Sequence, residues 1–388
     1  MERIGIYGGM FDPPHIGHIH IARKAIEQLG LDRLYIIPDH TAPNTAKIGY
    51  ATPQDRLQLT KLAFAGMEKA MVSDLSVGAP GITYTHEVVR KVRAFHPDAE
   101  LFLIVGSDKL ATLPNWKGFD KLMKTVCFVV ANRNYKGGKA NISVLSDRGA
   151  KFVELENEVL EISSSDVRRL LLFRCAGAFL PSSVAQYIQD NDLYGVWEDY
   201  KGLSMERLEQ VVISLLSRNR IAHVQGCRDT AIQLAQRWGA DVNDAARAGL
   251  LHDVTKALDG PLQLTVCSEY GTVLDDFSAE NTKTLHAVTG SLVARDVFGE
   301  NEAVVNAIRW HTTGKAGMTV LEKVLYVADY VEPNRDFPGV DDLRYLAFTD
   351  LDGALRMGFL LTLEHLKQQG ADISPSTYAA VESLNIKV

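Results

Sequence analysis

The sequence predicts two folds in one chain: an α/β domain with a doubly wound parallel sheet, followed by an all-α helical bundle. Short β-rich runs alternate with helical patterns in the first half, whereas the strand runs fade from about Ser204 onward. Between the halves, the stretch "LYGVWEDYKGLS" at residues 193–204 loses its periodicity and gathers charge and glycine. We therefore expect a domain boundary near Tyr200.

Six runs in the first half are typical of strands, because they are short and rich in β-branched and aromatic residues. In order they are "RIGIYG", "RLYIIP", "AMVSD", "LFLIVG", "TVCFVVA" and "KFVEL". Helical stretches such as "PQDRLQLTKLAFAGM" and "THEVVRKVRAF" separate them. This alternation predicts a Rossmann-like domain over residues 1–197, with its ligands beyond the carboxyl ends of the strands.

The second half has the apolar spacing of helices. Segments such as "MERLEQVVISLLSRNR", "RDTAIQLAQRWG", "DAARAGLLHDVTKAL" and "LEKVLYVADYV" repeat apolar residues three and four positions apart. Neither half contains an internal repeat or a low-complexity tract. An all-helical domain is therefore predicted over residues 203–388.

Composition narrows the classes of function. The chain has 388 residues and a net charge of −7, which argues against nucleic-acid binding and favours small molecules as partners. Its four cysteines form no C-x-x-C pair, as expected in a reducing compartment. The opening "MERIGIYGG" turns to glycine too soon for a signal peptide, and no apolar run approaches the roughly 18 residues of a membrane span. We expect a cytoplasmic protein with no membrane partner, and homo-oligomerisation stays open.

The first motif, "GGMFDPPHIGHIHIARKAIEQLG" at residues 8–30, follows a predicted strand and leads into an amphipathic helix. Gly8 and Gly9 let a ligand approach the backbone, and the N–H groups at a helix start favour an anion. His15 and His18 would lie within one turn of each other there. The motif predicts a phosphate site with two imidazole donors, although glycines for a turn and histidines for a cap would give the same spacing.

A second motif, "ISSSDVRRLL" at residues 162–171, places three hydroxyls before a helical run and an arginine pair in its first turn. Hydroxyls, backbone N–H groups and guanidinium groups are suited to a triphosphate. Alone, the segment could equally be a serine cap followed by solvated arginines.

Together the two motifs resemble the H-x-G-H nucleotidyltransferase superfamily, whose signatures are "G-G-x-F-D-P-x-H-x-G-H" and "I-S-S-T-x-I-R". The resemblance implies transfer of an adenylyl group from Mg²⁺-ATP, with His15 and His18 as catalytic residues at the α-phosphate. By the same resemblance, ATP is bound by Gly8, Gly9, Phe11, His15, His18, Gly106, Ser163, Ser164 and Arg168.

Residues 105–133, with "LPNW" at their centre, and "GITYTHEVVRKV" resemble the nicotinate-mononucleotide adenylyltransferases. The resemblance implies that Tyr84, Thr85, Asp108, Trp116 and Arg133 bind nicotinate mononucleotide. Met10 stands where the family often has Thr or Ser, and "DHTAPNTAK" replaces its usual "Pro-Pro-His-Lys" loop, which leaves the role of Lys47 open. The alternative is another adenylyltransferase, such as one acting on phosphopantetheine.

The second half contains its own cluster of metal-ligand residue types in helical context. Imidazole and carboxylate side chains are the mixed ligands that iron, manganese or a similar divalent metal accepts. A single buried histidine is usually a core residue, but four in one half are less easily explained that way. The candidate ligands are His223, His252, Asp253, His286, His311 and Asp329.

This order, with "EPNRDFPGVDDLR", resembles the HD-domain phosphohydrolases, and in particular the HD-type symmetrical diadenosine tetraphosphate hydrolases. The resemblance implies two divalent metals, iron or alternatively manganese, bridged by Asp253 as a catalytic residue. His223, His252 and Asp329 would complete one metal, and His286 and His311 the other. Lys256 and Arg335 are candidate phosphate ligands, with a solvated lysine and a structural salt bridge as their alternatives. The domain could also hydrolyse another nucleotide, or bind one without turnover.

Overall fold

The computed structural model describes residues 1–39, 50–77, 83–132, 138–158 and 160–386. The chain divides into two compact units, Met1–Trp197 and Glu198–Val388. Each unit is described by itself below. Among the described residues, no helix is both long enough and apolar enough to cross a membrane.

The N-terminal unit is built on a parallel sheet, as the alternating pattern predicts. Its described residues form six strands in the order β3-β2-β1-β4-β5-β6, and every neighbouring pair is parallel. The strands are β1 (Arg3–Gly9), β2 (Arg33–Pro38), β3 (Ala70–Val72), β4 (Glu100–Gly106), β5 (Cys127–Ala131) and β6 (Lys151–Leu155). The doubly wound α/β fold is thus confirmed.

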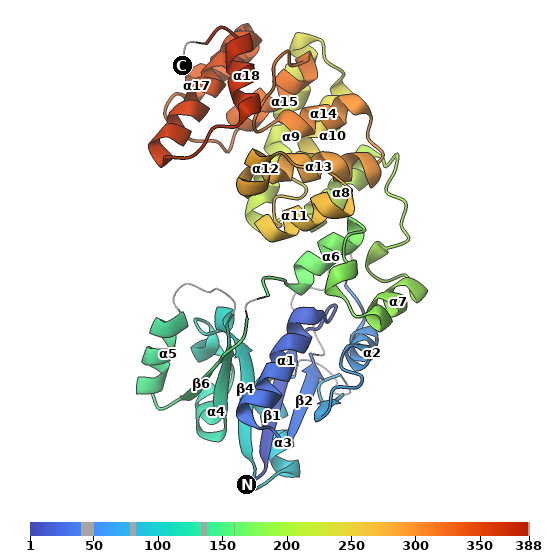
Figure 1. Cartoon of the computed structure of the whole chain (residues 1–388), viewed down its shortest axis with the longest axis vertical. Coiled ribbons are helices and arrows are strands. Elements are labelled where there is room, and N and C mark those ends of the chain that lie inside the picture. Colours follow the sequence, from blue (N-terminus) through green and yellow to red (C-terminus); the bar gives the residue numbers. More distant parts are fainter. Residues whose placement is uncertain (40–49, 78–82, 133–137, 159, 387–388) are drawn as a thin grey trace. The chain divides into compact units, whose positions relative to one another are not determined.

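Helices pack around the sheet of the N-terminal unit (Figure 1). The α-helices are α1 (Ile16–Leu29), α2 (Pro53–Ala63), α3 (Thr85–Phe95), α4 (Phe119–Thr125), α5 (Gly138–Asp147), α6 (Ser164–Leu172) and α7 (Ser182–Asp190). Short 3-10 turns are η1 (Ser107–Lys109), η2 (Leu113–Asn115), η3 (Gly177–Phe179) and η4 (Leu193–Gly195).

Alternation along the strands decides which side chains form the core of this unit. Ile4 and Ile6 of β1 are buried together with Val88 and Val92 of α3. A Cβ atom on Gly5, which lies between the two isoleucines, would come within 2.6 Å of the Leu31 side chain that follows α1. Gly5 therefore lets the chain after α1 pack closely against β1, the strand that ends at the first motif.

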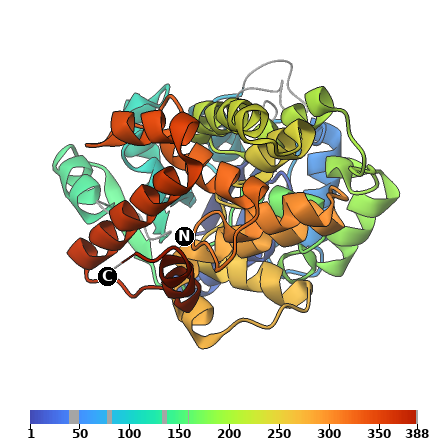
Figure 2. The ribbon, with the colours of Figure 1, turned by 90° about the horizontal axis from the view of Figure 1, so that it is seen from above.

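The C-terminal unit is helical in its described residues, as predicted. Its α-helices are α8 (Met205–Leu215), α9 (Ile221–Trp238), α10 (Val242–Leu251), α11 (Gly260–Glu269), α12 (Asp276–Glu280), α13 (Leu285–Asp296), α14 (Glu302–Trp310), α15 (Val320–Val331), α16 (Val340–Thr349), α17 (Leu351–Gln369) and α18 (Pro375–Ser383). Two 3-10 turns are η5 (Arg218–Arg220) and η6 (Thr282–Thr284). Helices α17 and α18, coloured red, lie side by side (Figures 1 and 2).

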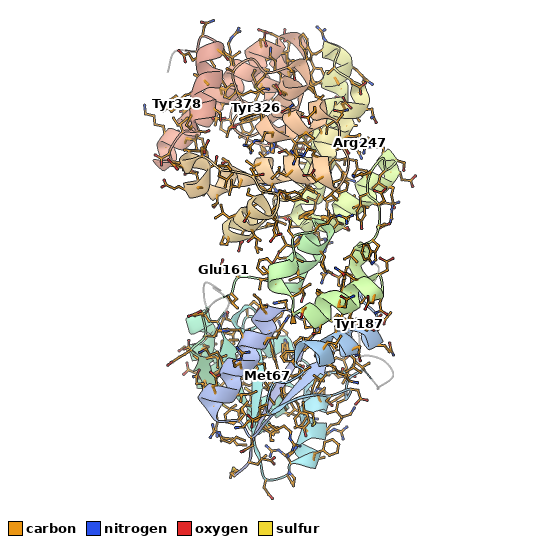
Figure 3. The ribbon with its side chains drawn as sticks, turned by 45° about the vertical axis from the view of Figure 1, so that its right-hand side comes forward. Met67, Glu161, Tyr187, Arg247, Tyr326 and Tyr378 are labelled. Atoms are coloured by element: carbon orange, nitrogen blue, oxygen red, sulfur yellow. The ribbon has the colours of Figure 1, made fainter. Side chains whose placement is uncertain are left out.

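Helices α9, α10, α13, α14 and α15 pack around one interior. Gly249 of α10 lets that helix approach α9, because a Cβ atom there would lie 2.6 Å from the Cα atom of Arg228. Tyr326 of α15 is wholly buried in the interior, whereas Tyr378 of α18 is exposed at the periphery (Figure 3). The packed helices place the predicted ligands His223, His252 and Asp329 toward this interior.

Candidate active sites

The two histidines of the first motif both cap α1. His15 is the N-cap residue, and its Nδ1 accepts a hydrogen bond from the Gly17 N–H at 3.2 Å. The Nδ1 of His18 accepts from the His15 N–H at 3.3 Å, and the two ring centroids lie 3.8 Å apart. Because both Nδ1 atoms accept, each neutral ring has its proton on Nε2, where it can donate to an anion. The capping role and the predicted phosphate role are therefore compatible.

Gly17 is required by the His15 ring. A Cβ atom on Gly17 would lie 3.0 Å from two atoms of that ring and 3.3 Å from the Ile162 side chain. Contacts this short force the neighbour to move. The glycine between the two histidines thus lets His15 fold back over the first turn of α1.

Phe11 has a left-handed backbone, with φ of 48°. Such a conformation is uncommon for a residue with a Cβ and is often found at functional sites. Its ring is buried and contacts the rings of Tyr7, His18 and Phe64 edge-on. Phe11, predicted to bind ATP, is therefore placed to hold the His18 ring.

The second motif, about 150 residues later in the chain, meets the first. The Ser164 hydroxyl donates to the Pro13 carbonyl at 2.9 Å, and Arg168 donates to the Asp12 carbonyl. Ser163 is the N-cap of α6 and bonds to Asp166. The prediction that the arginines lie in the first turn is wrong: α6 begins at Ser164, so Arg168 lies in its second turn. From there its side chain reaches back to the first motif.

Glycines end the strands at the sheet edge where the first and second motifs contact each other. Gly8 and Gly9 end β1, and Gly106 ends the neighbouring strand β4. These are carboxyl ends of parallel strands, the edge at which ligands of such sheets bind. The predicted ATP residues therefore share one edge of the N-terminal unit.

A group of three charged residues near this edge, Arg56, Asp39 and Asp12, was not predicted from the sequence. Arg56 is 2% exposed and donates from one nitrogen to the carbonyls of Met10 and Asp39, at 2.9 and 2.6 Å. Burial raises the pKa of Asp39 to about 6, although Arg56 opposes the shift. Arg56 thus ties the first motif, at Met10, to the chain that follows β2, at Asp39.

Asp12, the other acidic residue of this group, is almost fully buried. Its Oδ1 accepts from the Tyr194 hydroxyl at 2.7 Å and from the Ala51 N–H at 3.2 Å. Burial raises its pKa, although the Tyr194 hydrogen bond and Arg168 oppose the shift. Asp12 therefore ties the motif loop to η4 as well as to α6.

The predicted pyridine-nucleotide segments lie against each other. Tyr84 is the N-cap of α3, and the Lys117 ammonium lies 4.1 Å from the centre of its ring. A Cβ atom on Gly118 would lie 2.5 Å from the ring of His86, so the two segments are in close contact. Thr85 opens α3, Trp116 packs against the core, and Asp108 lies in η1 paired with Lys109. Arg133 and Lys47 lie outside the described residues.

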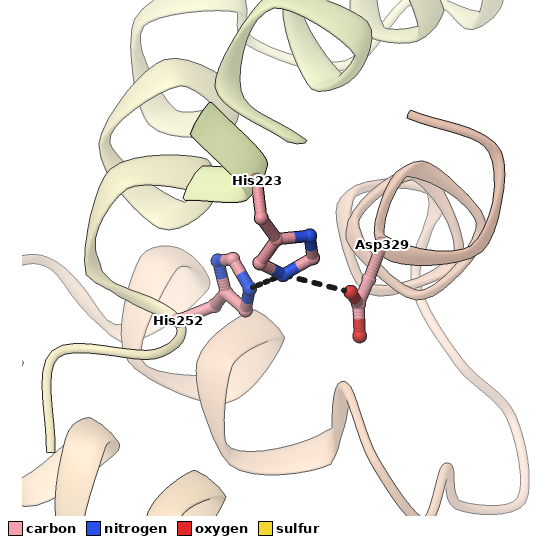
Figure 4. Close-up of side chains that lie close together, drawn as sticks. All are labelled: His223, His252 and Asp329. Carbon is pink, nitrogen blue, oxygen red and sulfur yellow. Dashed lines mark hydrogen bonds and ion pairs between the residues drawn. The ribbon is translucent and has the colours of Figure 1, made fainter. Parts of the chain in front are cut away.

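The predicted ligands of the C-terminal unit converge in space from helices α9, α13 and α15 and from the turns after α10 and α14. His223 Nε2 lies 3.3 Å from His252 Nε2 and 3.3 Å from Asp329 Oδ1 (Figure 4). Asp253 faces two sides: its Oδ2 is 3.6 Å from His223 Nε2, and its Oδ1 is 3.4 Å from His286 Nε2. An arrangement in which one carboxylate contacts two ligand groups is compatible with a bridging role.

Distances between donor atoms group the candidate ligands into two overlapping sets. Two sets have donor atoms within 4.8 Å of one another: His223, His252 and Asp329, and His252, Asp253 and His311. The first set matches the predicted grouping. The second set contains two of the residues predicted for the second metal, Asp253 and His311, together with His252. The His286 ring lies 3.4 Å from Asp253 Oδ1 and also contacts the Lys256 ammonium, at 3.0 and 3.1 Å from its two nitrogens.

Hydrogen bonds fix which nitrogen of each ring faces the cluster. His252 Nδ1 donates to the Gly249 carbonyl at 2.8 Å, and His311 Nδ1 donates to the Ile308 carbonyl at 2.7 Å. Their Nε2 atoms are then unprotonated and can act as metal ligands. His311 Nε2 is buried without a hydrogen-bond partner among the described residues. This donor set fits divalent metals.

The ionisation of His311 and Asp253 favours metal binding. For His223, burial is outweighed by the hydrogen bonds to Asp253 and Glu332 and by the charge of Asp329, which raise its pKa. Burial, reinforced by the neighbouring His252, lowers the pKa of His311 to about 4. Burial alone would raise the pKa of Asp253, but the surrounding imidazoles lower it well below its usual range. Neutral imidazoles beside ionised carboxylates are the protonation states that metals require.

Three cations surround the cluster. Arg220 lies 2.9 Å from Asp253 Oδ2, and Arg335 bonds to Asp329 Oδ1 at 2.5 Å. Burial lowers the pKa of Lys256, whose ammonium faces His286. Arg335 thus makes a salt bridge, the role named above as the alternative to phosphate binding. Lys256 is partly buried, so it differs from the solvated surface lysine that was its alternative. Arg220 was missed, although its position three residues before His223 was a signal.

A cavity of about 700 Å³ opens beside these residues. His311, Asp329 and Arg335 line one part of it, and Tyr330 and Phe337 supply aromatic surface. Its volume lies within the range of small-molecule sites, and it combines apolar walls with a few polar groups. The cavity can therefore hold a nucleoside next to the cluster.

Comparisons with known proteins define the class of each unit. Residues 6–170 match the cytidylyltransferase-like family, and residues 220–334 match the HD domain. The chain therefore combines a nucleotidyltransferase-type domain with an HD domain.

Three relatives resemble one unit or the whole chain. A Shouchella clausii protein named "Probable nicotinate-nucleotide adenylyltransferase" is 36% identical over 50% of this chain and 98% of its own length. A Bacillus subtilis "Bis(5'-nucleosyl)-tetraphosphatase, symmetrical" is 41% identical over 42% of this chain and 88% of its own length. A Mycoplasma genitalium "Probable nicotinate-nucleotide adenylyltransferase/Ap4A hydrolase" is 27% identical over 94% of this chain and 98% of its own length. The chain belongs to the nicotinate-nucleotide adenylyltransferase family in its N-terminal half and to the symmetrical bis(5'-nucleosyl)-tetraphosphatase family in its C-terminal half.

Proposed function

We propose that the N-terminal unit transfers the adenylyl group of ATP to nicotinate mononucleotide, forming deamido-NAD and pyrophosphate. The observation that supports it best is the meeting of the two motifs, in which Ser164 and Arg168 bond to Pro13 and Asp12 beside His15. Relatives named nicotinate-nucleotide adenylyltransferases add support. The proposed compartment is the cytoplasm.

In this reaction a phosphate oxygen of the mononucleotide forms a bond to the α-phosphorus of ATP as the bond to the pyrophosphate oxygen breaks. This direct displacement needs no covalent nucleophile from the chain, so the contribution of its residues would be positioning and charge stabilisation. The Nε2–H groups of His15 and His18 would donate to α-phosphate oxygens, with Arg168 on the outer phosphates. Mg²⁺ would enter with ATP. Tyr84, Thr85, Asp108, Trp116 and Arg133 remain the proposed residues for nicotinate mononucleotide.

We propose that the C-terminal unit hydrolyses diadenosine tetraphosphate symmetrically to two ADP. The supporting observation is the convergence of six His and Asp side chains beside the cavity. Two bound divalent cations, iron or manganese, would supply an activated water and neutralise phosphate charge. Lys256, Arg220 and Arg335 would bind the phosphates, and Tyr330 and Phe337 would contact a nucleoside.

One experiment tests both halves with the full chain. Nicotinate mononucleotide with Mg-ATP is supplied in one reaction, and diadenosine tetraphosphate with Fe²⁺ or Mn²⁺ in another, and the products are separated by chromatography. We expect His15→Ala to abolish deamido-NAD formation alone and Asp253→Ala to abolish ADP formation alone. Each variant serves as the folding control for the other unit.

The same assays decide between the alternatives. Phosphopantetheine supplied with Mg-ATP tests the other adenylyltransferase activity. A panel of other nucleotides tests the hydrolase substrate. If the protein binds nucleotide but releases no product with any metal, the C-terminal unit is a binding module and the proposed hydrolase activity is wrong.

A further inference from the structure

Three imidazoles of the metal-ligand cluster are oriented by backbone carbonyls, whereas His223 is oriented by a side chain. The Nδ1 atoms of His252, His286 and His311 contact the carbonyls of Gly249, Lys283 and Ile308. The Nδ1 of His223 contacts Glu332 Oε1 at 3.1 Å. Glu332 is 1% exposed, and the predicted site did not include it.

We infer that Glu332 is a positioning residue that fixes the ring of His223 for metal binding. The inference rests on the proposed function, since it assumes that the cluster binds metal. A carboxylate that accepts a hydrogen bond from one nitrogen of a ligating histidine fixes the ring proton on that nitrogen. The other nitrogen, which faces the metal, then becomes a stronger ligand. With Nδ1 bonded to Glu332, the Nε2 of His223 faces His252 and Asp329.

The Glu332 carboxylate is itself held in place. Its Oε2 accepts from the backbone N–H and from the side-chain amide of Asn334, each at 2.8 Å. The same amide donates to the Ala222 carbonyl at 3.0 Å, next to His223. Asn334 therefore holds Oε2, whereas Oε1 contacts the imidazole and lies 4.0 Å from Arg335 Nε.

Helix α9 provides space for this carboxylate. Gly226 lies three residues after His223, on the same face of the helix. A Cβ atom on Gly226 would lie 2.4 Å from Glu332 Oε2 and 3.0 Å from the Asn334 amide nitrogen. A glycine inside a helix lowers helix stability relative to alanine. Here its lack of a side chain lets the carboxylate approach His223.

The test is titration of the metal-stripped full chain with Mn²⁺ alone, followed by calorimetry. We expect Glu332→Ala to weaken Mn²⁺ binding at least about tenfold, with Glu332→Gln between it and the wild type because the amide oxygen still accepts. Gly226→Ala should weaken binding in the same direction, although alanine favours the helix.

A buried carboxylate elsewhere in the same unit provides the control. Glu300 is bound by Arg247, at 2.7 and 2.6 Å. We expect Glu300→Gln to lower the melting temperature without changing the Mn²⁺ affinity. Unchanged Mn²⁺ affinity in both Glu332→Ala and Gly226→Ala would overturn the inference, as would an equal loss in Glu300→Gln. Failure of the hydrolase proposal would instead appear as intact Mn²⁺ binding without ADP release.

Discussion

The Nε2 atoms of His223 and His252 lie 3.3 Å apart, and each ring bonds through its other nitrogen to an acceptor. In the neutral rings, two lone pairs therefore face each other with Asp329 3.3 Å from one of them. Such a contact becomes favourable when a proton or a metal cation lies between the donors. The geometry of these residues thus predicts properties that depend on a bound metal.

Metal should stabilise the C-terminal unit. Addition of Mn²⁺ to metal-stripped protein, at about 1,000 times its Kd, should raise the free energy of unfolding of that unit by about 4 kcal/mol. Asp253→Asn should reduce the gain, because Asp253 contacts both sides of the cluster. Scanning calorimetry of the full chain measures this, with the exposed Asp372→Asn as control. An equal gain in Asp253→Asn would exclude Asp253 as a ligand.

Gly17→Ala should impair adenylyl transfer while the protein stays folded. The new Cβ would lie 3.0 Å from the His15 ring and would push it slightly out of position. Because a displacement of about 1 Å at a reacting group can reduce kcat about 100-fold, this smaller shift should reduce kcat by less than that. Deamido-NAD formation under saturating substrates measures the effect. Gly177→Ala is the matched control, because no atom lies within 4 Å of its added Cβ. Full activity of Gly17→Ala would show that the position of the His15 ring is not critical.

Arg56→Met should destabilise the N-terminal unit by about 3 kcal/mol, because it removes a buried cation from two carbonyls and from Asp39. Urea unfolding gives the difference in free energy. The exposed Arg23→Met of α1 should have little effect. Equal stability of the two variants would mean that the buried guanidinium contributes no net stabilisation.

The stability of the N-terminal unit should depend on pH through Asp39. Its pKa is about 6 in the folded chain, above its ordinary value of 3.8, so between these values the folded state binds more protons than the unfolded state. The free energy of unfolding should therefore fall, by up to about 3 kcal/mol, as the pH rises from about 4 to 6.

Asp39→Asn should abolish this fall in the free energy of unfolding with rising pH. The variant should match the wild type near pH 4 and be more stable at pH 7, as measured by urea unfolding across the range. Asp98→Asn, at an exposed position, should keep the wild-type slope. Parallel pH profiles for Asp39→Asn and the wild type would be evidence against a raised pKa.

Local sequence patterns predicted both folds and most of the candidate site. Alternation of strands and helices predicted the sheet, and its switch to helical spacing predicted the second unit. The motif residues are close in sequence to one another, so a pattern could find them. Arg56 and Glu332 are different, since their partners lie 46 and 109 residues away.

No local periodicity encodes such distant contacts, because they exist only once the elements have packed. Glu332 did lie inside a segment quoted for its resemblance, but its interaction with His223 required α9 to be placed beside α15. Sequence reasoning thus named candidate ligands that lie together in the structure, but it missed Glu332, which contacts one of them.

The hydrogen bond between Asp12 and Tyr194 spans 182 residues and so affects synthesis on the ribosome. At about 5–20 residues per second, Tyr194 is added roughly ten to forty seconds after Asp12. Arg168 is also added late, 156 residues after Asp12. Until then the emerging chain contains both histidines of the first motif but not the two side chains that hold their loop. The nascent protein therefore completes this loop only when almost the whole N-terminal unit has been translated.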